Sequence, residues 1–321
     1  MRKNPDAVKM VVDTDTGIDD AMAILYALRV PEIDIVAFTT VWGNADIEPC
    51  TLNTLRLLEM TGDTHIPVAK GAGKPLLGPL THISTDVHGM DGIGNVNLPP
   101  PKLKVIEENA AQLIIRMARE NPGELTLMAL GPLTNVAAAL LAAPEIAKLY
   151  KEIVIMGGVF NETGNVSRVG GANGWHDPEA VQIVYEAGWK ILTVGINVTH
   201  KVLLSQEQLD VARDSGDPTA VFLHQICDFY FSRYVRTFGR RVCAMHDPLA
   251  IAIAADRSLI TRSEFRRADM ELGGTHTRGM TVGDFRPWAD PSLANVEIVF
   301  ECDQDRFLTR WLDVISGKPV T

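Results

Sequence analysis

The stretch KMVVDTDTGIDDAMAILYAL, residues 9–28, joins two apolar runs through a turn that is dense in carboxylates. The first run is β-branched, and Asp13, Asp15, Asp19 and Asp20 follow it within eight residues. The second run opens an amphipathic stretch. This order predicts a buried strand that ends in an acidic turn and leads directly into a helix from Asp19. A strand and a helix joined by so short a turn are typical of an α/β fold.

The same alternation of β-branched runs and amphipathic stretches continues along the chain. Strands are predicted at 9–12, 33–40, 66–69, 125–130, 152–158 and 190–195, and helices from Asp19 and at 47–60, 109–119, 133–142, 178–186 and 217–234. This cadence predicts an open, mostly parallel central sheet with a Rossmann-like core and helices on both faces. Residues 265–300 are less helical and indicate an antiparallel edge. No linker or repeat divides the sequence, so we expect a single domain over residues 1–321.

Composition narrows the possible partners and compartments. The 321 residues include 30 Lys and Arg against 40 Asp and Glu, a formal net charge of -10, which disfavours binding to a nucleic acid polymer or an anionic membrane. No apolar stretch approaches the roughly 20 residues that span a bilayer. We therefore expect a cytoplasmic protein. The four cysteines lack C-x-x-C spacing, which predicts reduced thiols rather than a zinc site or a disulfide framework.

The acidic turn also indicates a metal site. Ligands of parallel α/β folds bind beyond the carboxyl ends of the strands, where the sequence places residues 13–20, 39–44, 130–135 and 155–161. Burying several unpaired carboxylates costs several kcal/mol each unless a cation neutralises them. The cluster offers hard oxygens, with Asn44 nearby and no Cys or His, which favours Ca²⁺ or Mg²⁺. The less favoured alternative is a solvated turn whose aspartates only cap a helix.

The opening stretch resembles the D-x-D-x-G-x-D-D-A signature of the nucleoside hydrolases, the calcium-dependent inosine/uridine-type N-ribohydrolases. Seven further motifs occur in the order and spacing of that family: TTVWGN (39–44), HGMDGIGN (88–95), LGPLTNVA (130–137), VIMGGVF (154–160), WHDPEA (175–180), NVTHKVL (197–203) and MHDPLAIA (245–252). The resemblance covers nearly the whole chain. It implies the nucleoside hydrolase fold, a homodimer or homotetramer, and a small-molecule nucleoside as the binding partner.

The resemblance also implies a reaction, the hydrolysis of the N-glycosidic bond of a ribonucleoside to free base and ribose. Ca²⁺ would be bound by Asp15, Asp20, Asp247 and the backbone carbonyl of Leu130. Asp15 would also be the base that takes a proton from a calcium-bound water, and Asp13 would support the metal loop. Direct attack by that water would invert the anomeric carbon.

Further residues are assigned to the two halves of the substrate by the same resemblance. The ribose would be contacted by Asp19, Asn44 and Asn173 at its hydroxyls, by Asn165 at its 5′ side and by Met156 at its ring. His246 would donate a proton to the departing base, and the base pocket would be lined by His88, Tyr230 and Tyr234. A purely structural role stays open for each of these residues. His246 could be a histidine in a turn, His88 could face solvent, and Tyr230 and Tyr234, which are at helical spacing, could belong to the core. Trp175 could stack on a base or fill the core. His200 is expected to be structural or to support the residues that touch the substrate.

One departure from the family pattern concerns the sugar. Relatives usually carry Ala-Glu-Phe-Asn before the DPEA helix, whereas this chain has Gly171 in place of the glutamate and Ala172 in place of the aromatic residue. Either the enzyme accepts a modified or 5′-substituted nucleoside, or another residue, Trp175 or Asn161, fills the gap. Two alternatives come from other classes: a Mg²⁺-dependent haloacid-dehalogenase-type phosphatase with Asp13 as nucleophile, and a non-catalytic nucleoside-binding protein.

Overall fold

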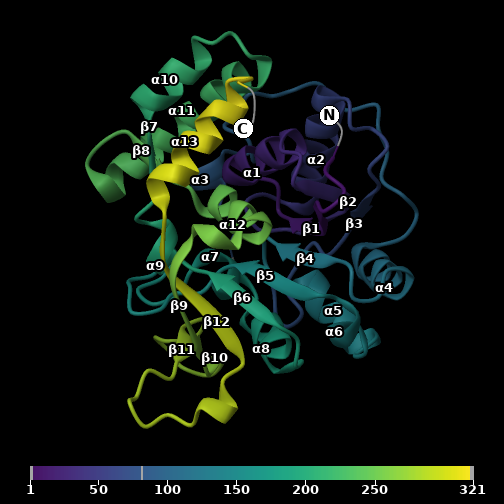
Figure 1. The fold of residues 1–321 in the computed structure, drawn as a ribbon, viewed down its shortest axis with the longest axis vertical. Coiled ribbons are helices and arrows are strands. Elements are labelled where there is room, and N and C mark those ends of the chain that lie inside the picture. The colour runs from purple at the N-terminus through teal and green to yellow at the C-terminus, as the bar shows by residue number, and fades with distance from the viewer. Residues whose placement is uncertain (1–2, 81, 319–321) are drawn as a thin grey trace.

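The computed structural model describes residues 3–80 and 82–318. Its centre is an eight-stranded sheet in the order β3-β2-β1-β4-β5-β6-β12-β9 (Figure 1). Neighbouring strands pair in parallel from β3 through to β12, and the edge strand β9 runs antiparallel to β12. The strands are β1 Val8–Thr14, β2 Ile33–Thr40, β3 Val68–Lys70, β4 Thr126–Ala129, β5 Glu152–Met156, β6 Ile191–Val194, β9 Ile260–Arg266 and β12 Val296–Cys302.

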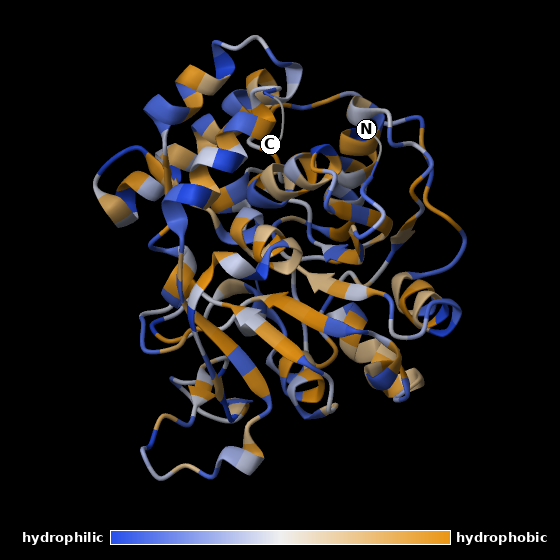
Figure 2. Cartoon of the chain, in the orientation of Figure 1, coloured by the Kyte–Doolittle hydropathy of each residue, from blue (hydrophilic) through white to orange (hydrophobic). Residues whose placement is uncertain are grey.

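Helices cover both faces of this sheet (Figure 1). The alternation of side chains along β1 shows how they do so: Met10 and Val12 belong to the buried cluster that includes residues of α1, α2, α11, α12 and α13, and Val11 belongs to the cluster that includes residues of α4, α5 and α8. Figure 2 shows the central strands as a largely hydrophobic band. The helices are α1 Ile18–Arg29, α2 Ile47–Thr61, α3 Thr85–His88, α4 Ala110–Glu120, α5 Thr134–Ala142, α6 Ile146–Leu149, α7 Ala172–His176, α8 Pro178–Glu186, α9 Ile196–Thr199, α10 Gln206–Arg213, α11 Pro218–Phe238, α12 His246–Ala255 and α13 Gln304–Ile315.

The register of the sheet brings the chemically important loops together. Asp13 of β1 lies opposite Thr39 of β2 and Ala129 of β4, so these three strands end at the same level. The turns that follow them therefore meet at one edge of the sheet. Two small antiparallel pairs lie outside the main sheet, β7 (Leu203–Ser205) with β8 (Val242–Ala244), and β10 (Ala268–Met270) with β11 (Thr281–Gly283).

The predicted fold class and element order are confirmed, with differences at the boundaries. Helix α11 runs to Phe238 rather than residue 234 and ends where Gly239 takes a left-handed conformation with φ 68°. The antiparallel edge strand β9 starts at Ile260, earlier than the predicted region 265–300. Strand β12 lies within that region but pairs in parallel with β6. Within the described residues all four cysteines are free, and no helix has the length and apolarity that a membrane crossing requires.

Candidate active site

A cavity of about 240 Å³ opens at the carboxyl ends of the central strands. Most of the residues that the sequence assigned to the site line it: Asp19, Asn44, His88, Leu130, Met156, Asn165, Asn173, Tyr230, Tyr234, His246 and Asp247. Asp15 and Asp20 lie behind this wall and are buried. The structure therefore collects the predicted residues from widely separated segments of the chain around one hollow.

Buried carboxylates form one end of the cavity. Oxygen atoms of Asp19, Asp20 and Asp247 lie within 4.8 Å of one another. Among the described residues, Oδ1 of Asp15 and Oδ1 of Asp19 have no hydrogen-bond partner. Burial, and then the charges of neighbouring aspartates, raise the pKa of Asp15 and of Asp247 well above the usual value. Such mutual repulsion is relieved by a cation, so the donor set fits a hard divalent metal.

The loop after β1 is held rigidly in place. Oδ2 of Asp15 accepts a hydrogen bond from the Asn44 backbone N–H at 2.9 Å. Asp20 accepts hydrogen bonds from the Thr14 hydroxyl, from the Gly17 N–H at 2.9 Å and from the Asn44 side-chain amide at 2.8 Å. Because backbone and buried side chains fix these carboxylates, the cluster is preorganised rather than assembled by a ligand.

Close packing around Asp15 requires glycine. At Gly43, which has φ 154°, a Cβ atom would lie 2.1 Å from Oδ2 of Asp15. At Gly131 a Cβ atom would lie 2.8 Å from Oδ1 of the same side chain. Two loops thus approach the carboxylate so closely that neither has room for a side chain.

Asp13 lies behind the loop that carries Asp15 and Asp20, and its support of a metal site stays a prediction. It is completely buried, and its Oδ1 accepts hydrogen bonds from the Thr39 hydroxyl at 2.6 Å and the Asn135 amide at 2.8 Å. Burial raises the pKa of Asp13 to about 7. Since Asp13 does not line the cavity, it cannot meet a substrate as the nucleophile of a phosphatase.

The side chain of Asn173 links the carboxyl ends of β4 and β5 by hydrogen bonds. Its Nδ2 donates to the backbone carbonyl of Leu130 and, at 3.0 Å, to that of Met156. The Asn173 side-chain oxygen is therefore the atom that would meet the ribose hydroxyl that the resemblance assigns to this residue. In Asn165 the roles are reversed, because its Oδ1 accepts from the Ala172 N–H at 3.0 Å and leaves the amide NH₂ for a ligand.

A chain of hydroxyl and imidazole groups crosses the opposite wall. The Tyr230 hydroxyl donates to Oδ2 of Asp19 at 3.0 Å and lies 3.4 Å from the Tyr234 hydroxyl. The Tyr234 hydroxyl is 2.7 Å from Nε2 of His246, whose Nδ1 is 2.6 Å from the Thr199 hydroxyl. Burial lowers the pKa of His246 well below its usual value, so the ring is a neutral hydrogen-bonding member of this chain.

One of the open alternatives is decided by position. His88 is 5% exposed and its Nδ1 accepts from the Ile18 N–H at 3.1 Å, so the solvent-facing alternative is wrong. Burial lowers its pKa to about 4. Tyr230 and Tyr234 are buried in the wall of the cavity, and their contact with a base stays a prediction.

Neither residue suggested to replace the missing glutamate does so. Trp175 packs edge-on to His82 with ring centroids 5.7 Å apart, and neither Trp175 nor Asn161 lines the cavity. A Cβ atom at Gly171 would already lie 3.1 Å from Ile196 and from Val159. The space beside Gly171 is thus filled by apolar side chains, which does not favour a pocket enlarged for a bulky 5′ substituent.

Sequence reasoning missed several polar residues of the cavity wall, among them His200, Arg233 and Thr237. His200, expected to be structural or to support the residues that touch the substrate, lies with its ring 5.4 Å from that of His246 and itself lines the cavity, and burial lowers its pKa. Arg233 and Thr237 carried no motif that singled them out. Their spacing from Tyr230 could have indicated them, because residues three and seven positions after Tyr230 lie on the same face of a helix.

Comparison with known proteins identifies the family. The sequence profile described as inosine-uridine preferring nucleoside hydrolase matches residues 10–309. A protein of Arabidopsis thaliana named probable uridine nucleosidase 2 is 42% identical over 305 residues, which cover 92% of this chain and 94% of that protein. The chain belongs to the nucleoside hydrolase family. An inosine-uridine preferring nucleoside hydrolase of Leishmania major is 38% identical over 318 residues, covering 97% of this chain and 99% of that one.

Solved structures of nucleoside hydrolases share the same fold. One described as the plant nucleoside hydrolase PpNRh1 superposes with a TM-score of 0.92 at 36% identity, covering 98% of this chain and 100% of the other. A purine-preferring ribonucleoside hydrolase from Gardnerella vaginalis gives 0.90 at 34% identity, covering 96% and 98%. The predicted family, fold and class of enzyme, an N-glycosyl hydrolase, are therefore confirmed, and neither alternative from another class is favoured.

Proposed function

We propose that this nucleoside hydrolase cleaves ribonucleosides to free base and ribose with Ca²⁺ bound by Asp15, Asp20, Asp247 and the Leu130 carbonyl. The observation that carries the proposal is that buried carboxylate oxygens of Asp19, Asp20 and Asp247 lie within 4.8 Å of one another at one end of a cavity. Asp15 is not a member of this group of three, and its place in the ligand set rests on its unpartnered Oδ1 in the adjoining loop and on the resemblance. When bound, Ca²⁺ would neutralise these charges, orient the sugar diol and lower the pKa of water. Assembly into a homodimer or homotetramer stays a prediction.

Asp15 is the proposed general base. Its Oδ2 is fixed by the Asn44 N–H, and its Oδ1 lacks a partner among the described residues. A carboxylate held in this way can accept the proton of the attacking water without rearranging. Asp19 offers its unpartnered Oδ1 to a ribose hydroxyl, while its Oδ2 is anchored by Tyr230.

The base departs toward the opposite wall. Cleavage of the C1′–N bond passes through an oxocarbenium-like transition state in which negative charge moves onto the base. The Tyr234 hydroxyl is placed to donate a hydrogen bond to the departing base, while the neutral ring of His246 can donate its Nε2–H to the oxygen of that hydroxyl. That His246 itself supplies a proton to the base stays a prediction. The carboxylates and this pair thus act on opposite sides of one bond.

A nucleoside panel tests the proposed function. Free base and reducing sugar are measured for uridine, cytidine, inosine and adenosine, with added Ca²⁺ and with EDTA. We expect both products in equal amounts, and loss of activity in EDTA that Ca²⁺ restores. Proton NMR should show α-ribose as the first sugar formed. No cleavage of any nucleoside, or β-ribose as the first product, would contradict the proposal.

A further inference from the structure

One face of α11 forms the wall of the cavity next to α3. We name it the α11 face and define it by Tyr230, Arg233, Tyr234 and Thr237, which all line the cavity and repeat at helical spacing. Two of its members, Tyr230 and Tyr234, belong to the hydrogen-bonded chain that ends at His246. The α11 face is therefore on the side of the cavity that receives the base in the proposed reaction.

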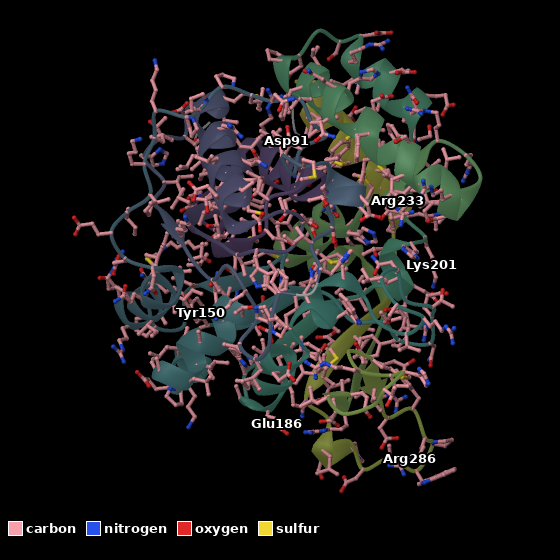
Figure 3. All side chains as sticks on the ribbon, turned by 180° about the vertical axis from the view of Figure 1, so that it is seen from behind. Asp91, Tyr150, Glu186, Lys201, Arg233 and Arg286 are labelled. Atoms are coloured by element: carbon pink, nitrogen blue, oxygen red, sulfur yellow. The ribbon has the colours of Figure 1, made fainter. Side chains whose placement is uncertain are left out.

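Arg233 is the one lysine or arginine among the described residues that line the cavity. Figure 3 labels this residue. Its Nε lies 3.5 Å from Oδ2 of Asp86 on α3, yet has no hydrogen-bond partner in the described part of the chain. The side chain of Asp86 is 59% exposed, so water screens its charge. The guanidinium therefore keeps both its charge and free donors for a ligand.

The other polar groups of this wall are less able to bind a base. The rings of His88 and His246 are already hydrogen-bonded within the protein, His88 to the Ile18 N–H and His246 to the hydroxyls of Thr199 and Tyr234. Tyr234 and His246 are hydrogen-bonded to each other. Arg233 thus supplies the positive charge of the wall, and a guanidinium carries five N–H donors and no acceptor.

We propose that Arg233 determines base specificity by donating hydrogen bonds to the carbonyl oxygen of oxo bases such as uracil and hypoxanthine. The inference rests on the proposed function. The exocyclic amine of cytosine or adenine presents N–H groups at the corresponding position, so two donors would face each other and both would lose their hydrogen bonds to water. As the C1′–N bond breaks, its electron pair moves onto the ring and its carbonyl oxygen, where a fixed positive charge stabilises the transition state more than the ground state.

The test compares matched pairs of substrates, uridine with cytidine and inosine with adenosine. In the native enzyme we expect kcat/KM to favour the oxo member of each pair by about tenfold or more. Arg233→Gln removes the charge and adds an acceptor while keeping a long polar side chain. We expect this variant to lower both ratios at least tenfold, through slower cleavage of the oxo member.

Asp86→Asn is the control variant, because it removes the ion pair and leaves Arg233 in the cavity. The oxo preference should persist in Asp86→Asn, which shows that Arg233 acts on the base rather than by joining α3 to α11. Unchanged ratios in Arg233→Gln, or equal loss in Asp86→Asn, would overturn the inference. An enzyme that cleaves nucleosides without an oxo preference also overturns it, whereas failure to cleave any nucleoside overturns the proposed function itself.

Discussion

The two ends of the cavity are built from different kinds of structure. The carboxylate end is formed by the turns after strands β1 and β4 and by the first turn of α12. Its residues Asp15, Asp20 and Asp247 are at most 3% exposed and lie among buried groups. The base end is one face of α11 together with α3, and it includes the exposed Thr237 and the half-buried Arg233. The difference indicates that the loops of the sheet hold the groups that cleave the bond, whereas the helices α3 and α11 select the leaving base. The sequence of these helices can vary without disturbing the sheet.

Substitution of a metal ligand should give the largest effect. Asp247→Asn removes one charge from the carboxylate cluster, and we expect kcat/KM for uridine to fall roughly 10³-fold or more because the metal no longer binds. Calorimetry with Ca²⁺ should show the same loss. Asp256→Asn, at the C-terminal end of the same helix, is the control and should keep both properties. Full Ca²⁺ affinity in Asp247→Asn would remove this aspartate from the metal site.

Gly43→Ala tests whether packing at the carboxylate end is as strict as the structure shows. The new Cβ would collide with Oδ2 of Asp15, so we expect Ca²⁺ affinity to fall about 10- to 100-fold. Gly62→Ala is a matched control, since Gly62 also has positive φ but a Cβ atom there would meet no atom within 4 Å. That variant should lose a little stability and no Ca²⁺ affinity. If both variants lost Ca²⁺ affinity equally, the cause would be backbone strain at a residue with positive φ rather than a collision with Asp15.

Tyr234→Phe probes the base end alone. Removing the hydroxyl breaks the hydrogen bond to His246, and we expect kcat for inosine to fall about tenfold while Ca²⁺ affinity is unchanged. Tyr230→Phe should alter both properties by a few fold, because Tyr230 is bonded to Asp19. If Tyr234→Phe weakened Ca²⁺ binding, the two ends would not be independent.

The smallest expected effect is on stability. A ligand that binds only the folded state at 100 times its Kd adds about 2.7 kcal/mol, so saturating Ca²⁺ should raise Tm by a few degrees. Differential scanning fluorimetry of native enzyme and Asp247→Asn, each with Ca²⁺ and with EDTA, checks this prediction. The shift should occur in the native enzyme and be absent in the variant. A shift of equal size in both would place the stabilising ion elsewhere.

The sequence predicted the carboxylate end better than the base end for a physical reason. Asp13, Asp15, Asp19 and Asp20 are close together in sequence, and the rule that parallel strands end together placed them beside Asn44 and Leu130. The wall of α11 depends on how a helix from late in the chain docks on α1 and α3, which no local pattern specifies. The sequence did not assign Arg233 and His200 to the cavity wall, because an arginine on a helix is commonly a surface residue and a histidine in an apolar stretch is commonly a core residue.

Uracil release measured during a calcium titration tests the central claim most directly. Metal-free enzyme is incubated with uridine while Ca²⁺ is added in steps, and free base is measured at each step. The account predicts no release in EDTA and full activity once the carboxylate site is saturated, with no recovery in Asp247→Asn. Equal rates of uracil release in EDTA and in Ca²⁺ would contradict it.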